Sequence, residues 1–228
     1  MKKALFWDFD GTLAHHNGKI WTNSLYTTLS DFEYNIDIEK IRQHFRSGHI
    51  WFNAEISYTD KIGQKWWDRL FNHFHIFYEH HKIIQTDIEQ INAIFKDRII
   101  DFRNHTLYEN TETVLRKCMQ IGYENYILSN HFPELPLVIK QLGLEEYFMN
   151  YVVSANIGYE KPRLEIFQYA LNIADFPEEC YMIGDNPIAD IQGGKSAGMK
   201  TILVHYNEGI SVADYKCESL IDIPLLLE

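Results

Sequence analysis

Residues 4–13 read ALFWDFDGTL, an apolar run that ends in two carboxylates and a glycine. The run from Ala4 to Phe9 predicts a short buried strand, and the Asp-Gly pair near its end predicts a turn. Asp8 and Asp10 are two residues apart, so both side chains project the same way if the strand pattern persists. One carboxylate of such a pair can attack an electrophile while the other transfers protons.

An Asp-Gly pair is also typical of a β-hairpin turn. A hairpin needs a second strand directly after the turn, whereas the residues after Leu13 are polar and then helical in pattern. The sequence therefore favours a carboxylate pair at the end of a single first strand.

The residues from about Trp21 to Asp101 have a helical periodicity, in which apolar side chains such as Ile41 and Phe45 recur at helical spacing. A capping-box pattern, TDIE at residues 86–89, predicts the start of the last helix in this block. We therefore expect an all-helical segment inserted after the first strand.

After about His105, predicted strands alternate with predicted helices. The strands are expected at residues 125–128, 151–154, 180–183 and 201–204, and the helices at 112–121, 134–142, 163–172 and 188–197. Such alternation is typical of a parallel sheet covered by helices on both faces. The first strand joins that sheet, so we expect an α/β fold with a Rossmann-like core.

Ligands of open parallel sheets bind beyond the carboxyl ends of the strands. Polar clusters follow four of the predicted strands: Asp8/Asp10, Ser129/Asn130, Lys161 and Asp185/Asp190. The Ser129 hydroxyl and backbone N–H groups beside it could hold phosphate oxygens, and Lys161 could neutralise a transferring phosphoryl group. Asp185 suits a direct magnesium ligand, and Asp190 suits an outer position that holds waters or Lys161. Taken singly, each cluster could instead be a helix cap, a turn or a solvated side chain.

The formal net charge is −11, from 21 basic and 32 acidic residues. A field of that sign repels nucleic acid and anionic membranes, so neither is expected as a partner. It also repels a phosphorylated substrate unless a metal and a lysine reverse the sign locally. Three scattered cysteines, an apolar start interrupted by Asp8, and no run long enough to span a membrane predict a cytoplasmic protein.

Taken together, the order and placement of these clusters resemble the motifs of the haloacid dehalogenase-like superfamily, along the whole chain. The matching residues are DFDGTL at 8–13, Ser129-Asn130, Lys161-Pro162, and Gly184-Asp185 with Asp190. Asn186 stands where serine is frequent in the family, and Arg163-Leu164 replaces the usual acidic-proline pair. Neither departure removes a reacting group.

The resemblance implies that Asp8 is the nucleophile and Asp10 the general acid and base. It implies Mg²⁺ on Asp8, Asp185 and the backbone carbonyl of Asp10. It also implies that Ser129, with Asn130 beside it, and Lys161 bind the substrate's phosphate, with Asp190 outside the metal ligands.

The implied architecture is a Rossmann-like core formed by residues 1–14 and 106–228, with a subclass I helical cap at 15–105. The implied reaction is magnesium-dependent hydrolysis of a small phosphorylated metabolite through an aspartyl-phosphate. A phosphosugar mutase and a non-catalytic binding module on the same fold stay open as alternatives. A dehalogenase is disfavoured, because an alkyl halide needs neither Asp10 as a proton donor nor a metal.

Three further features of the helical block could have either a structural role or a role in binding a ligand. We expect the histidine-rich stretch with His73, His75, His80 and His81 to be a solvated helix face rather than a metal site. The tryptophans Trp21, Trp51, Trp66 and Trp67 could stack on a ligand, but such residues are more typical of a core. The segment 46–51, where Gly48 breaks the helical pattern, is a candidate for substrate contacts.

Overall fold

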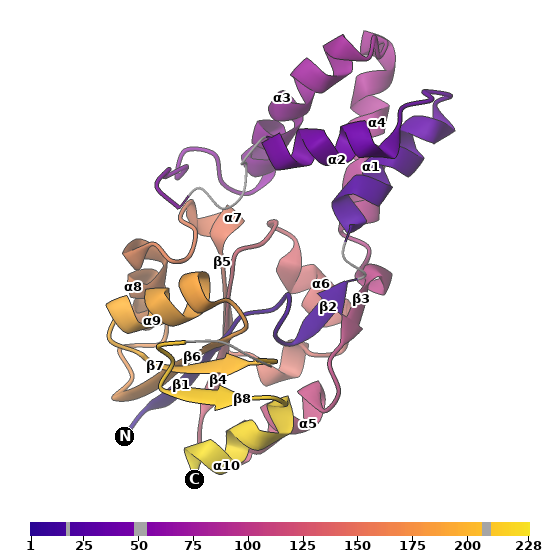
Figure 1. The fold of residues 1–228 in the computed structure, drawn as a ribbon. Coiled ribbons are helices and arrows are strands. Elements are labelled where there is room, and N and C mark those ends of the chain that lie inside the picture. The colour runs from indigo at the N-terminus through magenta and orange to yellow at the C-terminus, as the bar shows by residue number, and fades with distance from the viewer. Residues whose placement is uncertain (17–18, 48–53, 207–210) are drawn as a thin grey trace.

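The computed structural model describes residues 1–16, 19–47, 54–206 and 211–228. Its centre is a six-stranded sheet in which every neighbouring pair of strands is parallel (Figure 1). In spatial order the strands are β5 (Asn150–Val153), β4 (Glu124–Ser129), β1 (Lys3–Trp7), β6 (Glu179–Gly184), β7 (Lys200–Val204) and β8 (Tyr215–Cys217). The expected parallel α/β architecture is therefore confirmed, although the three-residue strand β8 was not predicted.

Helices cover both faces of this sheet, because alternate side chains of its strands point to opposite sides. The helices are α5 (Thr111–Gln120), α6 (Leu135–Gln141) and α10 (Ile223–Leu227) on one face, and α8 (Leu164–Ile173) and α9 (Gly193–Ser196) on the other (Figure 1). Leu5 and Trp7 of β1 share a buried core with α5 and α10, whereas Ala4 and Phe6 share one with α8. The central strand β1 is thus buried between the two layers of helices.

Between β1 and the rest of the sheet the chain makes a helical excursion. It consists of α1 (Ile20–Asp31), α2 (Ile38–Ser47), α3 (Gln64–His80) and α4 (Gln85–Ile99). Figure 1 shows these helices beyond the carboxyl ends of the strands, standing away from the sheet. Two short strands, β2 (Ala14–His16) and β3 (His105–Leu107), pair antiparallel where the chain leaves and rejoins the sheet region. Among the described residues, none of the helices combines the length and apolar character needed to cross a membrane.

The capping box predicted at residues 86–89 is wrong. The helix itself is present, but α4 begins at Gln85 with Ile84 as its N-cap, two residues before the N-cap predicted at Thr86, and the structure shows no side-chain cap there. Instead, the backbone N–H of Ile84 donates to the hydroxyl of Tyr34 (2.9 Å), which in turn donates to Asp87 (2.6 Å). A tertiary contact from the loop after α1 therefore replaces the local cap.

His44 of α2 lies in an aromatic contact with α3. Its ring stacks on that of His73 (centroids 4.6 Å apart) and contacts that of Phe77 (4.9 Å). Burial, and secondarily the charges of His73 and His81, lower the pKa of His44 to about 4. The expected solvated face therefore holds for His75, which is exposed, but not for His73, which is half-buried.

We expect His44 to make the protein less stable in mild acid. In the folded chain the His44 ring stays neutral down to about pH 4, whereas in the unfolded chain it binds a proton below its ordinary pKa of 6.5. The unfolded state is therefore favoured increasingly as the pH falls from about 6.5 toward 4, and the protein loses stability over that range. The expected loss is about 1–2 kcal/mol between about pH 7.5 and about pH 5, measured by urea denaturation. His44→Gln should flatten this dependence, whereas His75→Gln on the exposed face should not. An unchanged pH dependence in His44→Gln would contradict the assignment.

Candidate active site

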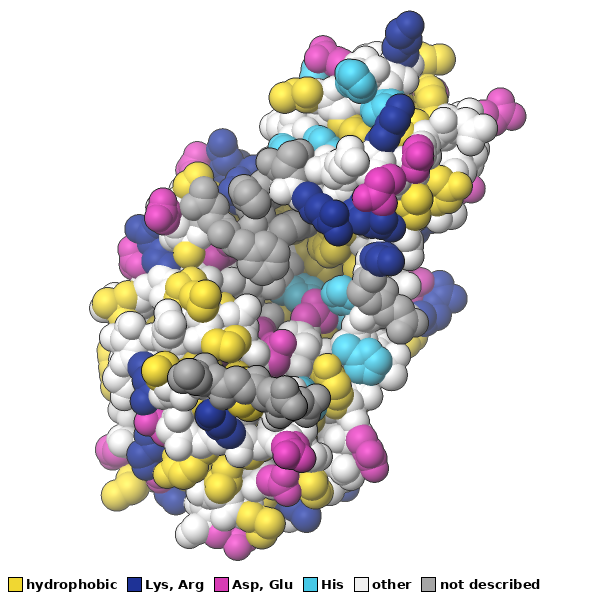
Figure 2. All heavy atoms as spheres, viewed as in Figure 1, with side chains coloured by type: hydrophobic (Ala, Val, Ile, Leu, Met, Phe, Trp, Pro, Cys, Tyr) yellow, Lys and Arg dark blue, Asp and Glu magenta, His cyan; other side chains and the backbone are white. Residues whose placement is uncertain are grey.

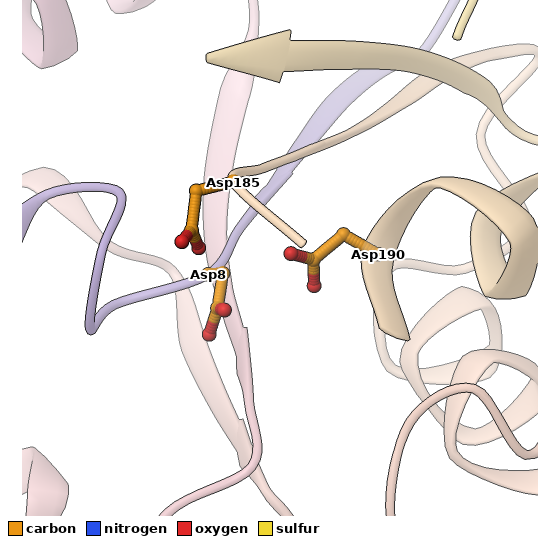
Figure 3. Close-up of side chains that lie close together, drawn as sticks. All are labelled: Asp8, Asp185 and Asp190. Carbon is orange, nitrogen blue, oxygen red and sulfur yellow. The ribbon is translucent and has the colours of Figure 1, made fainter. Parts of the chain in front are cut away.

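Two carboxylates meet at the carboxyl ends of the neighbouring strands β1 and β6. Asp8 follows β1, and its backbone N–H donates to the carbonyl of Ile183 (2.9 Å), which extends the pairing of the two strands. Asp185 follows β6 directly. Figure 3 shows both side chains at the same edge of the sheet, beside Asp190. One carboxylate oxygen from each of the three residues lies within 4.8 Å of the other two.

The ammonium group of Lys161 lies between two of these carboxylates. Its Nζ is 3.0 Å from Asp8 Oδ1 and 2.6 Å from Asp190 Oδ1, and its side chain is 1% exposed. Burial alone would lower the pKa of Lys161, but the carboxylates of Asp190 and Asp8 outweigh burial and raise it. The side chain of Asn130 donates to the Lys161 carbonyl (2.9 Å) and accepts from its N–H (2.7 Å). Lys161 is therefore a fixed positive charge beside Asp8.

Asp190 lies on η3 (Pro187–Gln192), a π-helical turn that leads into the short helix α9. The helix expected over residues 188–197 is thus present over residues 187–196, but its first six residues form a π-helix and not an α-helix. The Asp190 side chain is fully buried: one oxygen accepts from Lys161 and the other from the backbone N–H of Asn186 (3.0 Å). Both oxygens of Asp190 are thus engaged in holding Lys161 and the turn.

Asp185 faces the cavity instead. Burial, and secondarily the charge of Asp8, raise the pKa of Asp185 to about 6. Gly11 packs directly against this carboxylate: a Cβ at Gly11 would lie 2.4 Å from Asp185 Oδ2, and the φ angle of Gly11 is +84°. The hydroxyl of Thr12 donates to the other oxygen at 3.4 Å. The turn after β1 therefore requires glycine both for its backbone and for the space that Asp185 occupies.

The carboxylate of Asp10 is surrounded by three histidines that the sequence analysis did not single out. His131 Nε2 lies 3.1 Å from Oδ2, His105 Nδ1 lies 3.5 Å from Oδ1, and His16 Nε2 lies 3.7 Å from Oδ2. Burial alone would raise the pKa of Asp10, but His131 and His105 outweigh it and lower the pKa well below its usual range. The only sequence signal for His131 was its place directly after Asn130. His16 and His105 carried none, because the β2–β3 pairing brings them together.

The predicted site residues surround one cavity of about 350 Å³. Its wall contains Asp8, Asp10, Ser129, Asn130, Lys161 and Asp185, and Asp190 stands behind Lys161. Ser129 ends β4 and is 1% exposed. The opposite wall comes from α1, α3 and α4, and Figure 2 shows acidic and histidine side chains in the hollow between the helices and the sheet. Of the segment 46–51 expected to contact substrate, residues 48–51 lie outside the described residues.

Comparisons with known proteins found relatives in sequence and in fold. A family model described as haloacid dehalogenase-like hydrolase matches residues 2–198. Human haloacid dehalogenase-like hydrolase domain-containing protein 3 is 28% identical over 89% of this chain and 81% of its own length. Phosphoserine phosphatase of Thermus thermophilus is 31% identical over 51% of this chain and 46% of its own length. The crystal structure of 2-haloacid dehalogenase from Pseudomonas syringae superposes with a TM-score of 0.74 at 18% identity, covering 100% of this chain and 98% of that one, which shows a shared fold.

Proposed function

We propose that this chain, which belongs to the haloacid dehalogenase-like hydrolase family, is a phosphatase that hydrolyses a small phosphorylated metabolite through an aspartyl-phosphate on Asp8. The observation that carries this proposal is the placement of Asp8 at the cavity wall, 3.0 Å from the buried Lys161 ammonium. We also propose the division of the chain into a catalytic core, residues 1–14 and 106–228, and a cap, residues 15–105.

Asp8 would attack phosphorus, so that a bond from its carboxylate oxygen forms as the bond to the leaving alcohol breaks. Asp10 would give that alcohol its proton and then take one from the water that attacks the aspartyl-phosphate and frees Asp8. The lowered pKa keeps Asp10 ionised but makes it a weak base, so the His131 ring, 3.1 Å from it, is the neighbour that would share the proton in both steps. Lys161 and Ser129 would stabilise the charge on the equatorial phosphate oxygens.

The acidic group at the strand ends fits a divalent cation. Carboxylate oxygens are the ligands that Mg²⁺ prefers, and those of Asp8 and Asp185 lie within 4.8 Å of each other. We propose that these two residues and the backbone carbonyl of Asp10 hold Mg²⁺, with Asp190 acting through Lys161. Bound there, Mg²⁺ would neutralise charge on the phosphate and orient it.

Release of inorganic phosphate from a panel of phosphorylated metabolites, with p-nitrophenyl phosphate as a general probe, tests the proposal. We expect sustained release that stops with EDTA and returns with added Mg²⁺. Formation of an isomeric sugar phosphate without net phosphate release would favour the mutase instead. An absence of turnover on every ester would favour a binding module that retains the fold.

Gly11→Ala should disable the site by displacing Asp185. The new Cβ overlaps the Asp185 carboxylate, so we expect phosphate release to fall about 100-fold or more and the Mg²⁺ concentration for half-maximal activity to rise. Gly198→Ala is the matched control, because Gly198 has a similar φ of +81° but open space around its Cβ position. Both variants should lose about 1 kcal/mol of stability from backbone strain, but only Gly11→Ala should lose activity. Equal activities in the two variants would refute this role of Gly11.

A further inference from the structure

The cavity wall that faces Asp8 from the helical segment is apolar. It is formed by Ile20, Trp21, Trp66, Ile99 and, from the loop after β4, Phe132. Of the cavity-lining residues that the structure describes, Lys161 is the only lysine or arginine. The part of the cavity that would receive the leaving group of a phosphomonoester is therefore apolar, whereas the part that would receive the phosphate is charged.

Trp21 is held in place by other rings. Its indole ring lies 5.9 Å from the ring of Phe95, 6.3 Å from that of Trp67 and 6.3 Å from that of Phe132, the last at an interplanar angle of 67°. Trp66 and Trp67 are buried, as the sequence predicted, and meet edge to face at 5.1 Å. Trp21 and Trp66 both line the cavity, but of these three tryptophans Trp21 is the one that is partly exposed. A rigid aromatic surface therefore exists before any ligand binds, which reduces the entropic cost of binding a flat group.

The charges in the wall argue against a second anionic group on the substrate. The ammonium of Lys161 already contacts Asp8 and Asp190, and the three histidines face the carboxylate of Asp10. A carboxylate or second phosphate on the leaving alcohol would lose its hydration against tryptophan and isoleucine side chains, and the lining residues described by the structure offer it no further lysine or arginine. The volume of about 350 Å³ is at the small end of ligand cavities, enough for one ring system and a phosphate.

We propose that the substrate is a phosphomonoester whose alcohol carries one uncharged aromatic ring, attached directly or through a pentose, and that Trp21 contacts this ring. The proposal rests on the phosphatase function proposed above and adds the substrate class to it. Offset-stacked or edge-to-face contact between the two rings would supply selectivity for the leaving group, while Asp8 and Lys161 act on the phosphate.

Two matched pairs of esters test the substrate class. Benzyl phosphate is compared with glycerol phosphate, and a pyrimidine nucleoside 5′-monophosphate with ribose 5-phosphate, by kcat/KM for phosphate release. We expect the ring-bearing member of at least one pair to be favoured by about tenfold or more, the magnitude of aromatic stacking, and the favoured pair shows whether a pentose intervenes. Phosphoglycolate and phosphoserine, whose alcohols carry charges, should rank below the favoured ring-bearing ester.

Equal kcat/KM values within both pairs, or a preference for phosphoglycolate, would overturn the substrate class while leaving the phosphatase function intact. Failure of every ester, including p-nitrophenyl phosphate, would instead overturn the phosphatase function and the substrate class with it.

Substitution of Trp21 tests the residue. Trp21→Leu should reduce the preference for the ring-bearing ester about tenfold, and Trp21→Phe should keep most of it. Phe77→Leu, which removes a buried ring of α3 that does not line this cavity, is the matched control and should keep the wild-type preference. If Trp21→Leu does not fold, Trp21→Phe and competitive inhibition of the wild type by benzyl alcohol or the nucleoside provide the readout. A wild-type preference in Trp21→Leu, or no inhibition by either ring-bearing alcohol, would overturn the assignment.

Discussion

Asp8→Asn is expected to lower phosphate release by a factor of about 10,000 or more, because an amide has no anionic oxygen with which to attack phosphorus. The substitution keeps the size of the side chain and the acceptor that receives the N–H of Phe9 at 2.8 Å. The turn after β1 should therefore stay folded, and the loss should appear in kcat rather than in stability. Steady-state kinetics with p-nitrophenyl phosphate, alongside thermal unfolding of both proteins, makes the measurement.

A covalent intermediate gives a second readout of the same prediction. Acid quenching of the wild-type protein during turnover should trap a phosphoryl group on the peptide that contains Asp8, detected by mass spectrometry, and Asp8→Asn should trap none. Substantial activity in a folded Asp8→Asn protein would mean that water attacks phosphorus directly, and the aspartyl-phosphate mechanism would then be wrong.

The sequence allowed the site to be anticipated because its residues follow strands that are easy to recognise. The apolar runs before Asp8 and Asp185 are continuous, and parallel strands carry whatever follows them to one edge of the sheet. Lys161 lies several residues beyond the strand that it was predicted to follow, and the structure connects it to that edge through the paired hydrogen bonds with Asn130. The roles of these residues stay predictions until the variants are measured.

The remaining features depend on contacts between distant parts of the chain. His16 and His105 reach Asp10 because β2 pairs with β3, and a three-residue strand carries too little periodicity to be recognised. The start of α4 is set by Tyr34, so a local capping pattern was misleading there. The apolar cavity wall likewise arises where three helices converge, and helical periodicity does not distinguish a core tryptophan from one that lines a cavity.

Lys161→Met should damage the structure of the site as well as its activity. It removes the cation that lies between Asp8 and Asp190 and leaves two carboxylates facing each other, one of them fully buried. Loss of one partner from a buried ion pair typically costs about 3–5 kcal/mol, and we expect the free energy of unfolding to fall by that amount. Phosphate release should fall at least about 100-fold, because the lysine no longer stabilises charge on the transferring group.

Adding Asp190→Asn to Lys161→Met separates the two effects. The neutral amide can still accept the N–H of Asn186 but no longer carries a buried charge, so most of the lost stability should return while the activity should not. The matched control is the ion pair Lys195–Asp214, whose charged atoms lie 2.7 Å apart and whose side chains are both 36% exposed. Because this pair is exposed to solvent, Lys195→Met should lower the free energy of unfolding by no more than about 1 kcal/mol. If the double variant recovered activity together with stability, Lys161 would act only as a counter-ion to Asp190. The charge beside Asp8 would then have to come from the metal alone.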